Sequence, residues 1–282
     1  MELIKRGNYN YLGHSFRKDG KATYREKYLG KEVPENIEEI KEGFLRKCLE
    51  EAVFKKLKRI KESFRKEWNS YPNSVKREAV IDLAIKFTYN TNAIEGSKIT
   101  EGETDELIKR GMAPNRPVED VQESLNHAKT FLQAINEKKE LCPSTLLKWH
   151  YDIFKDTKKD IAGKLREYHI RVGSYTAPDW QDVERLMKEY LAWYNRNKTA
   201  LNPVELAARM HYRFEKIHPF GDGNGRAGRL IIAYILMKAG YPIAVIEYKK
   251  RKSYYHALER DENYFLQYFI RRYLAAFKKY LR

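Results

Sequence analysis

The stretch His218–Leu230, HPFGDGNGRAGRL, decides how the rest of the chain is interpreted, because it gathers a base, a carboxylate and two cations into thirteen residues. Taken singly, a His-Pro pair, a glycine-rich loop and two arginines on a helix are ordinary structural features. Their conjunction in one loop is typical of a site that holds a phosphate group beside a base.

The glycines and arginines of this stretch predict a polyphosphate cradle. Alternate glycines, Gly221, Gly223 and Gly225, allow successive N–H groups to turn inward around an anion. The helix that follows directs its positive N-terminal end to the same place. Arg226 and Arg229 are three residues apart, so both guanidinium groups lie on one face of its first turn.

Three polar side chains of the loop predict the chemistry beside that phosphate. His218 lies where Pro219 ends a helix, in a position to accept a proton from an attacking hydroxyl group. Asp222 offers a carboxylate to a Mg²⁺ ion that bridges the phosphates. Asn224 can donate a hydrogen bond to a phosphoryl oxygen while remaining neutral.

Residues 218–229 resemble the signature of the Fic (Fido) family: His-Pro-Phe, any residue, Asp or Glu, Gly-Asn-Gly-Arg, any two residues, Arg. The resemblance implies a Fic-type helical bundle and transfer of AMP from ATP, with Mg²⁺ at Asp222, to a protein hydroxyl. The target is a Ser, Thr or Tyr side chain of another protein or of the chain itself, and His218 is the general base. That the α-phosphorus is attacked follows from the resemblance alone, and the donor preference stays open. The implied phosphate-binding residues are Gly223, Asn224, Gly225, Arg226 and Arg229.

A second stretch, TNAIEG at 91–96, is similar to the inhibitory motif of the family: Ser or Thr, three residues, Glu, then Gly or Asn. Thr91 and Glu95 are four residues apart and share one face near a helix end. A carboxylate there can pair with a guanidinium group in bidentate fashion. By resemblance the partner is Arg229, so Glu95 disfavours the productive ATP pose. The alternative is an ordinary solvent-facing glutamate.

Residues from about 171 to 178, RVGSYTAP, break the helical pattern and predict a β-hairpin flap. The family has its flap at this place, and a flap strand can pair through its main chain with an extended target segment. Downstream, residues 250–260 could form an adenine pocket, although Tyr254 and Tyr255 equally suit a core. The expected docking residues of the flap are Gly173, Ser174, Tyr175 and Thr176.

The rest of the chain predicts a mainly α protein with a β appendage. Residues 1–33 favour an aromatic-rich hairpin around Asp19-Gly20, and residues 34–282 favour one helical domain. We expect a long amphipathic helix over 37–64, and Thr100 with Glu103 has the spacing of a capping box. The other expected helices cover 75–95, 118–135, 146–154, 183–194, 204–216, 226–238, 253–260 and 264–280.

The net charge of +16 can be interpreted in two ways. A nucleic-acid partner is one, but lysines interspersed with glutamates favour a solvated surface instead. The histidines show no metal-ligand spacing, so we expect no structural zinc. No apolar run approaches the roughly 20 residues of a membrane span. With two cysteines and no signal-peptide pattern, we expect a cytoplasmic protein outside the membrane.

Two other functions remain open at this point. In the first, the same loop binds an AMP-modified protein and Glu95 orients a water molecule that removes the AMP. In the second, the chain is a non-enzymatic regulator that binds a nucleotide or a nucleic acid through its basic surface and N-terminal hairpin. A homodimer is also left open, since family members often dimerise.

Overall fold

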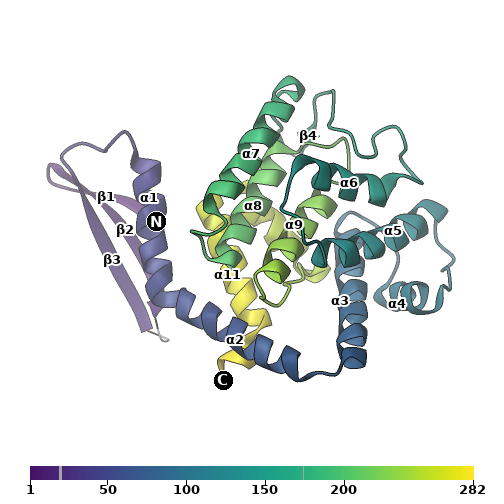
Figure 1. Ribbon diagram of the computed structural model, residues 1–282. Helices are drawn as coiled ribbons and strands as arrows, with labels where there is room; N and C mark the ends of the chain where they lie inside the picture. The colour runs from purple at the N-terminus through teal and green to yellow at the C-terminus, as the bar shows by residue number, and fades with distance from the viewer. Residues whose placement is uncertain (19–20, 174) are drawn as a thin grey trace. The chain divides into compact units, whose positions relative to one another are not determined.

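The computed structural model describes residues 1–18, 21–173 and 175–282, which form two compact units. One unit is Met1–Ser63 with Phe277–Arg282, and the other is Phe64–Ala276. The division falls inside helix α2 (Lys55–Ser70), whereas the sequence predicts a boundary after residue 33. Figure 1 follows the chain through these elements.

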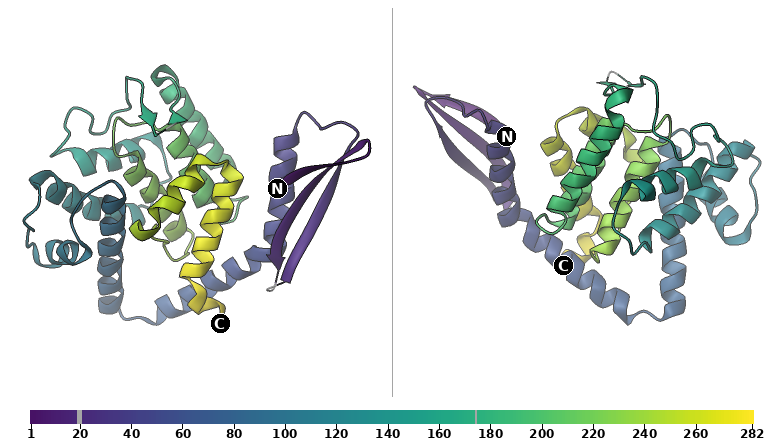
Figure 2. Two further views of the ribbon diagram at one scale, coloured as in Figure 1. Left: turned by 180° about the vertical axis from the view of Figure 1, so that it is seen from behind. Right: turned by 45° about the horizontal axis from the view of Figure 1, so that its top comes forward.

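The first unit contains an antiparallel sheet of strands β1 (Glu2–Arg6), β2 (Tyr9–Lys18) and β3 (Lys21–Gly30), in that order. The expected two-stranded hairpin was therefore incomplete, because β1 adds a third strand; the expected turn at Asp19-Gly20 lies outside the described residues. One face of the sheet packs on helix α1 (Ile37–Leu49), where Leu12 is buried against Phe44 and Cys48 (Figure 2). This shared core explains why the sheet and α1 belong to one unit.

The expected long helix is interrupted by a π-helical turn. Between α1 and α2 the backbone forms a π-helix over Glu50–Phe54 while staying in the right-handed helical region on both sides. The sequence carries a mark of this turn, since the apolar residues Cys48 and Val53 are five positions apart. A π-turn widens the helix by one residue and absorbs that spacing.

The second unit confirms the mainly α prediction. Its helix α9 is buried along nearly its whole length and contacts α3, α5, α6 and α8. A helix that is buried all round forms the centre of a bundle, so the loop that precedes α9 is held inside the unit. The helices of this unit are α3 (Asn73–Ile94), α4 (Glu101–Arg110), α5 (Val118–Ile135), α6 (Pro143–Phe154), α7 (Val183–Asn197), α8 (Pro203–Ile217), α9 (Asn224–Lys238), α10 (Arg251–Glu259) and α11 (Glu262–Ala276). Short 3₁₀ turns cover Trp180–Asp182, Tyr248–Lys250 and, in the first unit, Lys278–Leu281.

Local details agree with two further predictions. The capping box of α4 is present: Thr100 accepts a hydrogen bond from the Glu103 N–H, and the Glu103 carboxylate accepts one from the Thr100 N–H. The flap is a short hairpin in which β4 (Arg171–Val172) pairs antiparallel with β5 (Tyr175–Thr176). Among the described residues, no helix combines the length and the apolar character that crossing a membrane requires.

Candidate active site

His218 directly follows the last residue of α8, Ile217, as the C-cap and has a left-handed backbone, with φ 52° and ψ 59°. It is the one non-glycine residue with positive φ among those that the structure describes. Its Nδ1 lies 3.3 Å from the carbonyl oxygen of Glu215, and a carbonyl can only accept. Nδ1 therefore carries the proton, and Nε2 keeps the lone pair that a general base needs. Burial lowers the pKa of His218, which favours the neutral ring.

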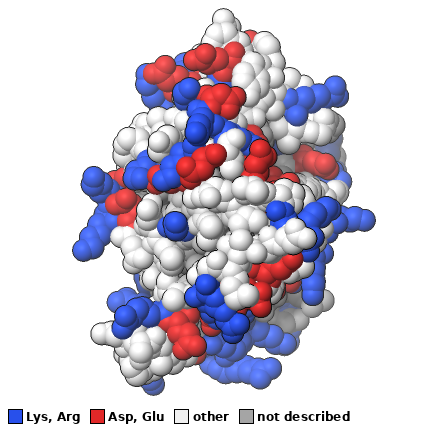
Figure 3. All heavy atoms as spheres, turned by 90° about the vertical axis from the view of Figure 1, so that its right-hand side faces the viewer, with Lys and Arg blue, Asp and Glu red and all other residues white. Residues whose placement is uncertain are grey.

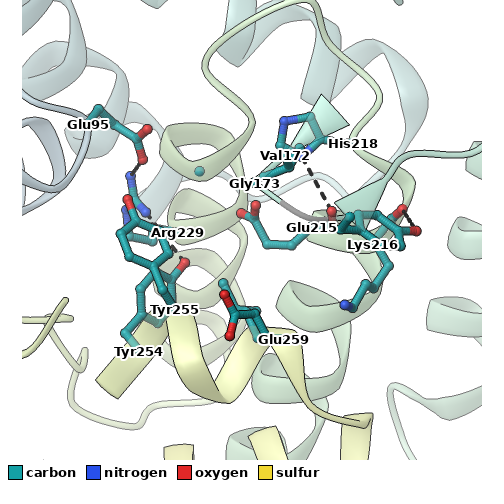
Figure 4. A pocket seen from close by; sticks show the side chains of 13 residues that line it. Glu95, Val172, Gly173, Glu215, Lys216, His218, Arg229, Tyr254, Tyr255 and Glu259 are labelled. Atoms are coloured by element: carbon teal, nitrogen blue, oxygen red, sulfur yellow. Dashed lines mark hydrogen bonds and ion pairs between the residues drawn. The ribbon is translucent and has the colours of Figure 1, made fainter. Parts of the chain in front are cut away.

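A cavity of about 470 Å³ brings His218 together with residues from four other segments. Arg229 of α9, Glu95 at the end of α3, Tyr254 of α10 and Gly173 of the flap also line it. Figure 4 shows these side chains around one space, with Glu95 and Arg229 at one end and His218 at the other. A volume of this size suits a small-molecule ligand such as a nucleotide.

Glu95 and Arg229 form an ion pair at one end of this cavity. Glu95 Oε1 lies 2.5 Å from an Nη of Arg229, a residue that is only 2% exposed (Figure 4). The same nitrogen lies 3.4 Å from the main-chain oxygen of Thr91. Burial works against the charged guanidinium, but the Glu95 carboxylate outweighs it and raises the pKa of Arg229. The sequence-based pairing of Glu95 with Arg229 is thus present in the geometry.

A second, polar cavity of about 250 Å³ contains Asp222 and Arg226. Arg226 is buried and forms an ion pair with Glu123 of α5, and its guanidinium carbon lies 4.3 Å from the centre of the Phe154 ring. The Lys158 ammonium group contacts Asp222 Oδ2 at 2.5 Å and Glu123 Oε1 at 3.3 Å. Four charged groups therefore compensate one another at the start of α9.

The residues fit a single-carboxylate magnesium site. Asp222 Oδ2 already faces a cation, the Lys158 ammonium, so its electrostatic surroundings accept positive charge. No cluster of three or more His, Cys, Asp or Glu side chains suited to a metal occurs among the described residues. A Mg²⁺ ion here would take one ligand from Asp222 and the others from phosphates and water, which is how Mg²⁺ is commonly held.

The structure corrects two details of the predicted phosphate cradle. Of the three alternate glycines, only Gly223 has a positive φ, at 74°. Gly225 lies against the ion pair instead, because a Cβ there would meet the Glu95 carboxylate and the Arg229 guanidinium group and make these side-chain ends shift. The Asn224 side chain bonds the main chain of Phe220 through both its oxygen and its nitrogen, at 2.8 Å each, instead of facing outward toward a phosphoryl oxygen. Asn224 therefore closes the loop on itself.

Two buried side chains that the sequence did not mark as functional, His150 and Arg166, bond main-chain carbonyls of the loop. Because the N–H of Gly163 donates to Nδ1 of His150, the Nε2 of that ring must carry its proton, and it donates to the Asp222 carbonyl at 2.9 Å. Burial lowers the pKa of His150 to about 4. Arg166 donates from Nε to the His218 carbonyl at 2.9 Å.

The flap lies over the cavity and is attached to α8. Tyr175 donates its hydroxyl hydrogen to the carbonyl of Lys216, at 2.8 Å. Gly173 forms the turn with φ 59°, and Thr176 is exposed. Ser174 lies outside the described residues. Val172 and Gly173 line the cavity, so the exposed edge of the flap borders the space that His218 faces.

The site residues that the sequence did not predict were missed for one reason. Glu123, His150, Lys158 and Arg166 lie far along the chain from the loop, and none stands in a recognisable motif. One indirect sign exists: Glu123 interrupts the helix 118–135 on a face that the structure shows to be buried, where an unpaired carboxylate would be costly. The candidate adenine-pocket segment does reach the site, since Tyr254 and Tyr255 both line the cavity.

The face drawn in Figure 3 carries both signs of charge. Over its upper and middle parts, lysine and arginine side chains lie among aspartate and glutamate, whereas basic side chains gather at its lower end. Ion pairs such as Lys109 with Asp82 and Arg185 with Glu189 belong to the same pattern. Ion pairs of this kind are typical of an interspersed, solvated charged surface.

Comparisons with known proteins agree with this geometry. Residues 140–236 match the model of the Fic/DOC family. The chain is 28% identical over 242 residues to "Protein adenylyltransferase fic-1" of Caenorhabditis elegans, covering 82% of this chain and 48% of that protein. It is 31% identical over 192 residues to "Protein adenylyltransferase Fic" of Drosophila virilis, covering 66% and 40%. The chain thus spans about half or less of these relatives' length.

Among solved structures, the fold is similar to a Fic domain containing signalling protein from Bacteroides thetaiotaomicron. The TM-score is 0.69 and the identity 26%, with 80% of this chain and 97% of the other covered. The predicted Fic-type helical fold is therefore confirmed.

Proposed function

We propose that this chain, which carries a Fic domain, is a protein adenylyltransferase that transfers AMP from ATP to a hydroxyl side chain of a protein. One observation carries the proposal: the unprotonated Nε2 of His218 and the guanidinium group of Arg229 face the same cavity beside the N-terminus of α9. Such a cavity joins a base to a site for a polyphosphate. The names of the relatives support the same activity.

The reaction joins the target hydroxyl oxygen to the α-phosphorus of ATP. His218 Nε2 takes the hydroxyl proton as the new O–P bond forms, and the bond from the α-phosphorus to the β-phosphate oxygen breaks. Pyrophosphate leaves, and the target carries AMP. The first amide groups of α9 and the two arginines bind the phosphates, and the flap pairs with the target segment.

Mg²⁺ belongs to the proposal as a partner of ATP, held by Asp222. When bound, it would neutralise phosphate charge and help to orient the leaving pyrophosphate. Lys158 contacts Asp222 at present and would have to release that carboxylate. Arg226, already paired with Glu123, would meet the phosphates from the side of the polar cavity.

Glu95 restrains this activity in the proposal. Its carboxylate holds the guanidinium group of Arg229, which would otherwise contact the terminal phosphate of ATP. Because Arg229 is almost fully buried, the pair is poorly screened by solvent, and ATP must displace it to bind productively.

The test is self-labelling, or labelling of added protein, with ATP that carries the label on its α-phosphate. Glu95→Gly should increase the labelling rate by about tenfold or more, as expected for coupling between two competing partners of one arginine. His218→Ala should abolish the label in that background. ATP labelled on the γ-phosphate is the matched control and should leave no label, because pyrophosphate departs. Equal labelling of the unaltered chain and Glu95→Gly would contradict the restraint.

Removal of AMP is a second candidate, favoured by the position of Glu95. Its side chain is 29% exposed and lines the same cavity as His218, so it can also orient a water molecule. An AMP-modified protein incubated with the unaltered chain and with Glu95→Ala separates the two activities. Release of AMP that depends on Glu95 would favour removal over transfer.

A further inference from the structure

Arg166, between α6 and the flap, has an unusual set of partners for a buried arginine. It is 3% exposed, and its guanidinium group donates to three main-chain carbonyls. Nε donates to His218 at 2.9 Å, one Nη to Tyr168 at 2.8 Å, and the other Nη to Pro178 at 2.6 Å. Its own N–H donates to the carbonyl of Pro219 at 2.9 Å. One side chain thus joins the catalytic loop to both ends of the flap.

No carboxylate is paired with this guanidinium group among the described residues. Asp179 acts on it only through longer-range attraction, and burial lowers the pKa of Arg166. A buried charge that is balanced by carbonyl dipoles alone is costly to keep. Arg209 of α8 shows the usual solution, since it is equally buried but pairs with the carboxylates of Glu205 and Glu262.

The bond to His218 constrains a strained residue. A left-handed backbone is unfavourable for a residue with a Cβ atom, and it persists only where surrounding contacts hold it. The His218 N–H is held by the carbonyl of Phe214 at 2.9 Å, and its carbonyl is held by Arg166. The two bonds together hold both peptide groups that flank the His218 Cα, and with them the direction of the Cα–Cβ bond from which the ring extends.

The bonds to Tyr168 and Pro178 constrain the flap. The hairpin consists of only two residue pairs, Arg171 with Thr176 and Val172 with Tyr175, which cannot be stable alone. Its two ends approach each other where Ala177 N–H donates to the Ile170 carbonyl at 3.1 Å. Arg166 ties the carbonyls just outside this closure to the loop.

We propose that Arg166 is a positioning residue that sets the separation between the flap and the His218 ring, and therefore where a flap-bound hydroxyl meets Nε2. The inference rests on the proposed function. It has a physical reason in the need for the reacting atoms to lie within a fraction of an ångström of the productive geometry. Lysine cannot replace this residue, because a single ammonium group cannot span three separated carbonyls as the planar fork does.

The test uses Arg166→Lys in the Glu95→Gly background, with α-labelled ATP as the probe. We expect the labelling rate at saturating ATP to fall by about tenfold to a hundredfold, as a misplaced base would cause. The dissociation constant for ATP should change by less than about threefold, because Arg166 does not line the nucleotide cavity. Arg209→Lys is the matched control, because it also replaces a buried guanidinium group by an ammonium group. It should leave the labelling rate near that of its parent.

A merely structural role predicts different results. Arg166→Lys would then lose ATP binding and labelling together, or would behave as Arg209→Lys does at equal thermal stability; either outcome overturns the proposal. Arg166→Met adds a second readout, since removal of a nearby positive charge should raise the pKa of His218, which NMR of labelled histidine can measure. An unchanged His218 titration in Arg166→Met would also count against it.

The inference can be separated from the proposed function. If Glu95→Gly transfers no label from ATP, the proposed function fails, but hydrogen exchange still decides the role of Arg166. Amides of residues 168–173 and 175–177 should then exchange faster in Arg166→Lys while those of α8 stay unchanged. If the flap amides exchange at the same rate in Arg166→Lys as in its parent, the positioning role is overturned without reference to activity.

Discussion

Glu215 lies on the last turn of α8 and His218 caps the helix three residues later, yet burial shifts the pKa values of the two groups in opposite directions. It lowers the pKa of His218 and raises the pKa of Glu215 to about 8. The Glu215 side chain is 12% exposed, and its Oε1 has no hydrogen-bond partner among the described residues. Burial disfavours the charged form of each group. Near pH 7 the site therefore contains a neutral base and a neutral carboxyl group.

The labelling rate of Glu95→Gly should rise from pH 5 and reach its plateau before about pH 7, because only the neutral His218 ring can accept a proton. Burial places the pKa of His218 below the ordinary value of about 6.5. Initial rates from pH 5 to pH 9 measure this. A decline around pH 8 is also expected, since ionised Glu215 would attract Arg229 away from the phosphates. Glu215→Gln should remove the decline and keep the rise. A rate that still increases above pH 7.5 would contradict the assignment of the base.

At the scale of elements, helix ends place the functional side chains. Helix α3 stops at Ile94, Glu95 follows, and Gly96 takes a positive φ of 101° so that the Ser97 N–H can reach the Asn92 carbonyl at 3.0 Å. Helix α8 ends at His218 by a similar left-handed residue. Two elements that are remote in sequence thus terminate around one cavity, and their caps decide where Glu95 and His218 lie.

Helix α4, which follows Glu95 closely, offers a test of such caps. Thr100→Ala should lower the free energy of unfolding by about 1 kcal/mol, because the Glu103 N–H loses its partner. Thr100→Ser keeps a hydroxyl acceptor and is the control, with an expected change of a few tenths of a kcal/mol. Urea unfolding followed by circular dichroism measures both. Equal stability of the Ala variant and the parent would show that the box contributes nothing.

At the scale of the whole second unit, three buried histidines make folding dependent on pH. Burial lowers the pKa of His127 and His211 to about 3 and that of His150 to about 4. The unfolded chain takes up these protons near pH 6.5, whereas the folded chain does not. Protonation therefore favours the unfolded state as the pH falls below about 6.5. The free energy of unfolding continues to decrease until the pH reaches the pKa values of the histidines in the folded protein.

Stability should decrease steeply between pH 6.5 and pH 5, by up to about 1.4 kcal/mol per pH unit for each buried histidine. Urea unfolding at closely spaced pH values gives the slope, which counts the net protons bound on unfolding. Glu215, neutral when folded and ionised when unfolded over this range, releases one proton and offsets one histidine. His127→Gln should reduce that slope by close to one proton. His256, which is exposed, provides the control His256→Gln for the loss of a histidine side chain as such. A stability that is flat over this range would contradict the assignment of neutral buried rings.

Local patterns predicted much of the fold. The capping residues, the left-handed Gly96 and the 3.6-residue periodicity marked most helices, because each depends on neighbours a few positions away. They did not reveal β1, the π-turn of Glu50–Phe54 or the extent of the first unit. Those features depend on which surfaces pack against each other.

By itself the sequence predicted the residue types of the loop: a candidate base, the cations that flank it and, through a family resemblance, the glutamate that pairs with Arg229. Only the tertiary structure decided what holds these groups in place. Glu123 meets Arg226 across 103 positions of the chain, and His150 meets Asp222 across 72. Asn224 also turned inward to its own loop. A motif records residue types at fixed spacing, whereas packing in three dimensions decides which partners pair with the polar groups that are removed from water.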